Sequence, residues 1–130
     1  MKKNLIRQLS FDFALKIIKL YQHLQKNGER IMSAQLLKCG TSIGANVEEA
    51  QAAQSSKDFI SKLCISSKES RESRYWLTLL KASGYLDQYS EKEAILEDIN
   101  SIIKILTKII KTTTSQDKKM KSNSASGGGS

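Results

Sequence analysis

The chain has 130 residues, a formal net charge of +8 and no proline. This length supports one domain with one core, and the helix formers that fill residues 10–111 disfavour β-rich folds. No stretch approaches the ~20 consecutive apolar residues of a membrane-spanning helix.

The ends and cysteines of the chain indicate where it resides. The basic N-terminus is not followed by a signal-length apolar run, because Arg7, Gln8 and Asp12 interrupt it. Cys39 and Cys64 lack C-x-x-C spacing and neighbouring histidines. We therefore expect a cytoplasmic protein in a reducing compartment, without a membrane partner.

Apolar residues at spacings of three and four predict the first two helices. The first is expected to begin at about Ser10, a good N-cap, and to end at Gly28 as a C-cap. The second is expected from about Glu29 or Met32 to Gln54. Both have one apolar face, so each must pack against other elements.

The third and fourth helices have clearer ends. Residues 56–83 carry a row of apolar and serine side chains at heptad spacing, which Gly84 closes. The fourth helix opens with a capping box formed by Ser90 and Glu93. Three short connections between four helices predict an all-α, antiparallel up-down-up-down four-helix bundle over residues 1–111.

Residues 112–130 lack a core-forming pattern. Positions 111–130 contain four lysines and one aspartate, so we expect a disordered basic tail. Its last residues, SASGGGS, are typical of an expression linker and carry no functional argument.

The stretch CGTSIGANVEE at positions 39–49 allows three interpretations. A phosphate-binding loop is excluded because Gly40 and Gly44 are one residue too close and no lysine follows. A membrane dimer face is excluded because Lys38 and Glu48 bracket a short uncharged run. The remaining interpretation is a close crossing of helices in a soluble bundle.

A hairpin of the second and third helices that turns near Ser55 makes this interpretation specific. Residues equally far from the turn lie level, so small residues meet small residues and the backbones can approach closely. Such packing can compensate for a helical glycine, which costs about 1 kcal/mol relative to alanine. The predicted level pairs are Gly44 with Ser66, Gly40 with Ser70, and Leu37 with Ser73.

Polar side chains form a row beside this crossing. They could form a metal or acid–base site, or a hydrogen-bonded network that fixes helix register or a subunit contact. The row contains Ser42, Asn46 and Glu49 on the second helix and Glu69, Glu72 and Trp76 on the third.

The single histidine, His23, argues against an enzyme. A dimetal bundle requires Glu-x-x-His motifs, but the residue three before His23 is Leu20. A hydrolytic triad would need a strained serine and an acidic partner for the histidine. We therefore expect no catalytic residues, no metal and no cofactor.

Basic residues of the third helix lie near Tyr75 and Trp76, a combination that can bind nucleic acid by charge and stacking. The alternative that we favour pairs the arginines with Glu69 and Glu72 and places Trp76 in the core. The candidate nucleic-acid-binding residues are Lys62, Lys68, Arg71 and Arg74.

Several segments carry a family resemblance. SFDFALKIIKLYQHL, QLLKCGTSIGANVEEAQAAQSSKDFISKL and SSKESRESRYWLTLLKASGYL resemble the bacterial four-helix-bundle family that includes proteins encoded in 23S rRNA intervening sequences. The resemblance covers residues 10–110. Its most specific parts are the runs T-S-I-G-A-N-x-x-E-A and K-E-x-x-E-x-x-Y-W-L.

The resemblance implies a homopentamer of four-helix bundles. Related proteins are accessory factors of diversity-generating retroelements, in which a basic pentamer binds nucleic acid and a reverse transcriptase. Ser70 and Ser73 stand where the family often has Ala and Thr. The family's characteristic polar and aromatic positions correspond to Ser42, Asn46, Glu49, Glu69, Glu72 and Trp76.

The functional expectation combines charge with this resemblance. We expect a non-enzymatic oligomer that binds RNA or an RNA–protein complex, with DNA as a further possible ligand, through a basic surface. The alternative is a protein-interaction adaptor, such as an accessory subunit of a reverse transcriptase, that does not itself bind nucleic acid.

Overall fold

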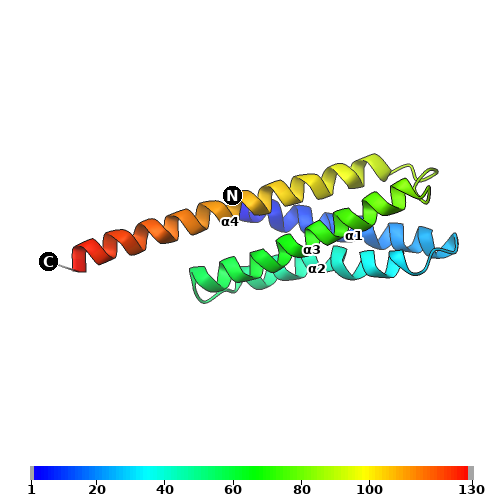
Figure 1. Cartoon of the computed structure of the whole chain (residues 1–130). Helices are drawn as coiled ribbons and strands as arrows, with labels where there is room; N and C mark the ends of the chain where they lie inside the picture. Colours follow the sequence, from blue (N-terminus) through cyan, green and yellow to red (C-terminus); the bar gives the residue numbers. More distant parts are fainter. Residues whose placement is uncertain (1, 129–130) are drawn as a thin grey trace.

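A computed structural model describes residues 2–128, with side chains described for 5–123. Four helices run up-down-up-down as the sequence predicts (Figure 1). Within this range there are no strands; Met1 and residues 129–130 of the predicted tail lie outside it. The helices are α1 (Lys2–Lys26), α2 (Met32–Gln51), α3 (Ser56–Ala82) and α4 (Lys92–Gly128).

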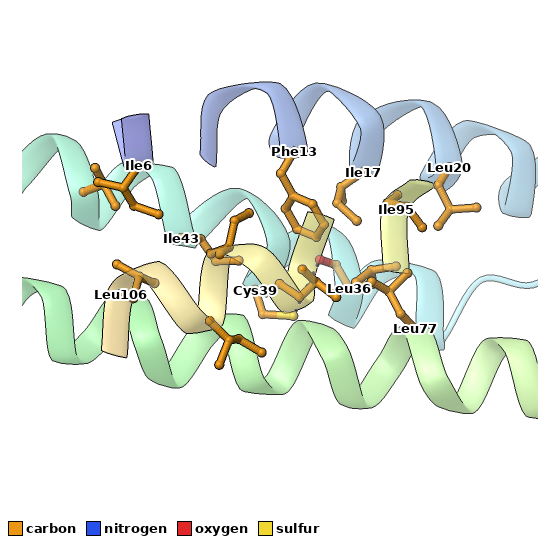
Figure 2. Packing of buried hydrophobic residues seen from close by; sticks show 14 of the residues in the cluster. Ile6, Phe13, Ile17, Leu20, Leu36, Cys39, Ile43, Leu77, Ile95 and Leu106 are labelled. Carbon is orange, nitrogen blue, oxygen red and sulfur yellow. Dashed lines mark hydrogen bonds between the residues drawn. The ribbon is translucent and has the colours of Figure 1, made fainter. Parts of the chain in front are cut away.

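The apolar faces of all four helices meet in one core. Each helix packs against its two neighbours, and α1 closes the bundle against α4. Figure 2 shows Phe13 and Ile17 of α1 directed toward Leu36 and Cys39 of α2. Burying each large apolar side chain contributes about 1.5–3 kcal/mol. Other fully buried members are Leu20, Ile43, Leu63, Leu77, Ile95, Ile99 and Leu106.

The start of α1 differs from the prediction. The helix begins at Lys2, and Ser10 is a buried residue within it whose Oγ donates to the Arg7 carbonyl oxygen at 3.2 Å. The reason is tertiary packing: Ile6, seven residues before Phe13, lies on the same face and is buried. Core contact therefore extends α1 beyond the position that the capping pattern favours.

The predicted glycine ends of α1 and α3 are confirmed. Gly28 and Gly84 adopt positive φ values of 85° and 88°, a region that glycine enters without a Cβ penalty. Just beyond them, the backbone N–H groups of Glu29 and Tyr85 bond back to carbonyl oxygens in the last helical turns. These contacts satisfy groups that a helix end leaves free.

A buried carboxylate organises the start of α2. Glu29 accepts hydrogen bonds from the backbone nitrogens of Ile31, Met32 and Ser33 at 3.1, 2.9 and 2.6 Å. Burial alone raises the pKa of Glu29, but these backbone bonds and one from the Ser33 side chain outweigh it, so the pKa is lowered from 4.5. Glu29 thus satisfies donors that would otherwise be orphaned at the helix N-terminus.

The hairpin between α2 and α3 turns earlier than predicted. The second helix ends at Gln51, three residues before the predicted Gln54. Ser55 is the N-cap of α3, and its side chain accepts from the backbone nitrogen of Asp58 at 3.1 Å. This cap holds Ser55 in an extended conformation, so the connection cannot continue as helix.

The two glycines of α2 approach a different helix from the one predicted. A Cβ added at Gly40 would lie 3.0 Å from Ile17, and one added at Gly44 would lie 3.4 Å from the Ser10 carbonyl oxygen. Both neighbours belong to α1, not α3. Counting residues from the turn of a hairpin predicts how far along the helix axis a residue lies. It does not predict which side of the helix the residue faces, so it did not show that both glycines face α1.

Serines of α3 make the corresponding approach to α2. The Ser66 Oγ donates to the Ile43 carbonyl oxygen at 2.9 Å, and the Ser73 Oγ lies 3.3 Å from the Cys39 Sγ. Ser66, Ser73 and the intervening Ser70 are all fully buried. Short polar side chains therefore bring the α3 backbone close to α2 and find partners within the bundle.

The fourth helix continues past the predicted boundary at Lys111. It is helical to Gly128, and Figure 1 shows its C-terminal part projecting beyond the bundle. Among the described side chains, Ile109 is the last buried one. Residues 112–126 include no glycine or proline to end the helix.

The α1–α2 approach predicts a size limit at Gly44. Replacing Gly44 with leucine should lower the free energy of unfolding by about 1–3 kcal/mol, because the side chain would press on the rigid Ser10 backbone. Gly44→Ala should stay within about 1 kcal/mol of the native protein, since helix propensity offsets a tight Cβ contact. Chemical denaturation measures both; equal stability of the leucine variant would contradict this packing.

The capping role of Glu29 predicts a pH-dependent stability. Because its pKa is lowered in the folded chain, its contribution is fully present above the ordinary value of 4.5 and is lost as pH falls through the folded-state pKa. Glu29→Gln should therefore cost about 1 kcal/mol at neutral pH. The difference between the two proteins in thermal melts should shrink in acid; a constant difference across pH would argue against the charged cap.

Candidate nucleic-acid interface

A groove with basic walls lies between α3 and α4. Its volume is about 340 Å³. Arg71 and Lys111 supply exposed cations from opposite helices, Ser67 and Thr107 supply hydroxyls, and Ile110 gives an apolar contact. Cys64 completes the lining. The groove therefore offers positive charge and hydrogen-bonding groups together at one seam.

The register of the two helices extends this basic seam. The Arg74 Nη1 donates to the Asn100 Oδ1 at 3.3 Å, which fixes the level of α3 against α4. Lys104, Lys111 and Lys118 recur every seven residues, and this spacing places them on one side of α4. A row of lysines thus follows the groove and continues onto the projecting part of α4.

The cations of this seam are not neutralised within the chain. Across residues 5–123, neither Arg71, Lys104 nor Lys111 has a carboxylate oxygen within 4.0 Å. Their charge is available to an external anion. The ion pairs of this range are Arg7–Glu48, Lys16–Asp98, Lys81–Glu93 and Lys121–Asp117.

The four candidate nucleic-acid-binding residues do not share one surface. Arg71 and Arg74 lie toward α4, and Lys68 is exposed to solvent. Lys62 is half-buried and precedes Arg71 by nine residues, which at about 100° per residue places it on the opposite side of α3. The structure therefore groups the two arginines with lysines of α4.

The favoured alternative for the arginines is wrong. Neither Arg71 nor Arg74 pairs with Glu69 or Glu72 in the described structure, and Arg74 instead bonds to an α4 side chain. Trp76 is half-buried beside the core cluster, and its buried Nε1 has no hydrogen-bond acceptor. The ring of Tyr75 meets Trp76 edge-on at a centroid distance of 5.2 Å.

The polar row of α2 is a local arrangement. The Asn46 Nδ2 donates to the Ser42 carbonyl oxygen at 2.9 Å and to the Ser42 Oγ at 3.1 Å. Glu49 is exposed and makes none of the ion pairs of the described range. These side chains bond along α2, and their role in a network between helices or subunits stays a prediction.

The carboxylates of the α3 row surround a buried thiol. The pKa of Cys39 is raised to about 11, chiefly by burial and in smaller part by Glu72 and Glu69, against the opposing effect of its hydrogen bond with Ser73. Such a thiol stays protonated near neutral pH and is a poor nucleophile or metal ligand. Among the described residues, no group of three His, Cys, Asp or Glu side chains could hold a metal ion.

His23 lies apart from these carboxylates. Its ring packs against Tyr89 at a centroid distance of 4.9 Å, and its Nε2 lies 3.2 Å from the Asn27 amide nitrogen. These are structural contacts near the end of α1.

Sequence reasoning missed the α4 side of the groove, which Thr107, Ile110 and Lys111 line. It also missed Asn100, which bonds to Arg74, and Lys104 on the same side of α4 as Lys111. One signal was present: the recurrence of lysine at 104, 111 and 118 marks a charged stripe beside the apolar face. The lysine stripe lies beside α3 because α3 and α4 are neighbours in the bundle. The spacing of residues within one helix does not predict which helix is its neighbour.

None of the four helices, over the part described, combines the length and hydropathy that a membrane crossing requires.

Comparison with known proteins supports the resemblance seen in the sequence. The chain is similar to a crystal structure of a protein of unknown function from the S23 ribosomal protein family of Bacteroides thetaiotaomicron. The two are 46% identical, the match covers 85% of this chain and 99% of the other, and the TM-score is 0.80. Comparison with curated proteins finds no match. A sequence model described as 23S rRNA-intervening sequence protein matches residues 2–108, and the chain therefore belongs to the 23S rRNA-intervening sequence protein family.

Proposed function

We propose that this chain is a non-enzymatic, cytoplasmic bundle protein that binds RNA, alone or within an RNA–protein complex. The observation that carries the proposal is the row of unpaired cations along the α3–α4 seam, where Arg71 and Lys111 face one groove. Phosphates bound there would release counterions, which is the main driving force of non-specific nucleic-acid binding. The same chemistry admits DNA.

The absence of catalysis is part of the proposal. The buried Cys39 is held protonated, and His23 is engaged with an aromatic ring and an asparagine. The groups beside Cys39 do not activate it as a nucleophile, because Glu72 and Glu69 raise its pKa and Ser73 only donates a hydrogen bond to it. The polar atoms that face the α3–α4 groove belong to binding groups, namely cations and hydroxyls.

RNA binding should depend steeply on salt. Fluorescence anisotropy with a structured rRNA fragment should show binding at low salt and a roughly linear fall of log K with log salt concentration, because each phosphate contact releases counterions. Thermal melting at each salt concentration controls for unfolding. Failure to bind at low salt would overturn the proposed function.

We further propose that the chain assembles as a homo-oligomer, and specifically a homopentamer. An apolar stripe of Phe11, Leu15 and Ile18, whose exposed fractions are 60%, 48% and 39%, runs along the outer face of α1. Ile65 and Leu79 of α3 are also exposed. Two such faces on different helices suit a head-to-tail ring, in which each copy covers the stripe of its neighbour.

Light scattering should report a mass near five times the 14.5 kDa of one chain. Replacing Phe11 and Leu15 with serine should shift the mass toward the monomer, because the apolar contact that holds neighbouring copies is lost. A control pair of exposed polar positions away from both apolar faces, Gln88→Ser and Lys104→Ser, should leave the mass unchanged. A monomeric native protein would contradict the assembly.

The stripe on α1 also favours a second candidate, a protein-interaction adaptor for a partner such as a reverse transcriptase. In that case the Phe11/Leu15 double variant would lose a partner that nuclease treatment does not release. RNA affinity would be unaffected by the same variant. These outcomes separate an adaptor from an RNA-binding protein.

A further inference from the structure

We infer that the α3–α4 groove holds a single-stranded segment of nucleic acid, with phosphates on Arg71, Lys104 and Lys111 and a base stacked on Tyr75. This inference rests on the proposed function and specifies where the nucleic acid binds and that it is single-stranded. It follows from the close spacing of packed helices, the charge pattern of the seam and one exposed aromatic ring.

The close spacing of packed helices favours a single strand. The axes of packed helices lie roughly 8–10 Å apart, so the space above their contact is a narrow trough. Its lining joins the cations Arg71 and Lys111 to the apolar side chain of Ile110. A duplex would rest across such a trough and reach only its rim, whereas a single strand can lie within it.

The charge of the seam changes along its length. Toward the α3–α4 connection, the surface depression at the seam is lined by Glu93 and Glu97, and Glu93 lies 3.9 Å from Lys81. These carboxylates disfavour phosphate at that end. The strand is therefore placed between the Arg74–Asn100 contact and the projecting part of α4.

The basic part has the length of a short strand. From Asn100 to Lys118 the helix rises about 27 Å at 1.5 Å per residue. For comparison, OB-fold grooves, which also combine cations with aromatic rings, take roughly 4–16 nucleotides of single strand. Ser67 and Thr107 add hydroxyl oxygens along the path; the Thr107 Oγ1 donates its own hydrogen to the Ile103 carbonyl oxygen at 2.7 Å and remains an acceptor.

Tyr75 supplies a surface for stacking. It follows Arg71 by one helical turn, its exposed fraction is 59%, and its ring is steadied by the edge-on contact with Trp76. A base stacked there would place its phosphates near the Arg71 guanidinium. Stacking of this kind tolerates any base, so the groove would bind single strands with little sequence preference.

The test uses the full chain and a fluorescent, unstructured oligouridine, followed by anisotropy across salt. Arg71→Gln with Lys111→Gln should weaken binding about 10-fold or more and reduce the salt slope by about 1.4, the value for two lost contacts to a single strand. The matched control, Lys19→Gln with Lys26→Gln on α1, removes equal charge and should leave both quantities near native values.

Two further variants separate charge, stacking and folding. Tyr75→Leu should weaken binding several-fold while leaving the salt slope unchanged, because no phosphate contact is lost. Arg71→Lys with Lys111→Arg keeps both cations and should retain the native salt slope. Matching circular dichroism melts would show that each variant folds.

Three outcomes would overturn the inference. Equal weakening by the α1 control pair would mean that charge acts diffusely and not at the groove. Stronger binding of an RNA duplex than of the oligouridine would remove the single-strand assignment. Unchanged binding of the Arg71/Lys111 glutamine variant would show that the α3–α4 groove is not the binding site. All three leave the proposed function standing, whereas absence of RNA binding by the native chain at low salt overturns that function.

Discussion

The close approach of α2 to both of its neighbours is the constraint on which the bundle depends. Toward α1, Gly40 makes room for the Ile17 side chain and Gly44 lies against the Ser10 backbone. Toward α3, Ser66 spans the gap with one hydroxyl that donates to the Ile43 carbonyl oxygen. These contacts set the separation of α1 and α3. Because α4 packs against those two helices, the shape of the α3–α4 seam follows from residues that do not line it.

Function and stability draw on different parts of this bundle. Among the described residues, the buried polar side chains are serines and Glu29, which caps α2. The buried thiol of Cys39 has a raised pKa and is therefore a weak nucleophile. The exterior carries many cations without partners and an uncovered stripe on α1. This division fits the proposed function, in which a polyanion would bind along α4 and an apolar surface would cover the stripe on α1.

Sequence periodicity predicted the four helices and their antiparallel order, because each apolar face has a single way to be buried in a short bundle. Periodicity did not predict the helix ends that tertiary contacts determine. Burial of Ile6 extends α1, and the Glu29 cap sets the start of α2. For the candidate interface, the sequence of α3 was enough to predict Arg71. Lys111 lies beside Arg71 only because α4 packs against α3, and the sequence of α4 alone does not show this. The family match extends to residue 108, which leaves the projecting part of α4 outside the matched region.

The change of charge along α4 has a kinetic consequence. Its first turns include Glu93, Glu97 and Asp98, whereas its later turns carry lysines from Lys104 to Lys121. The side-chain charges of α4 therefore form a dipole whose positive end lies toward the projecting part, opposite in sense to the backbone dipole of the helix. Long-range fields rotate charged molecules before they touch. For a polyanion that binds as proposed, this asymmetry would favour encounters in which the lysine-bearing part of α4 faces the ligand.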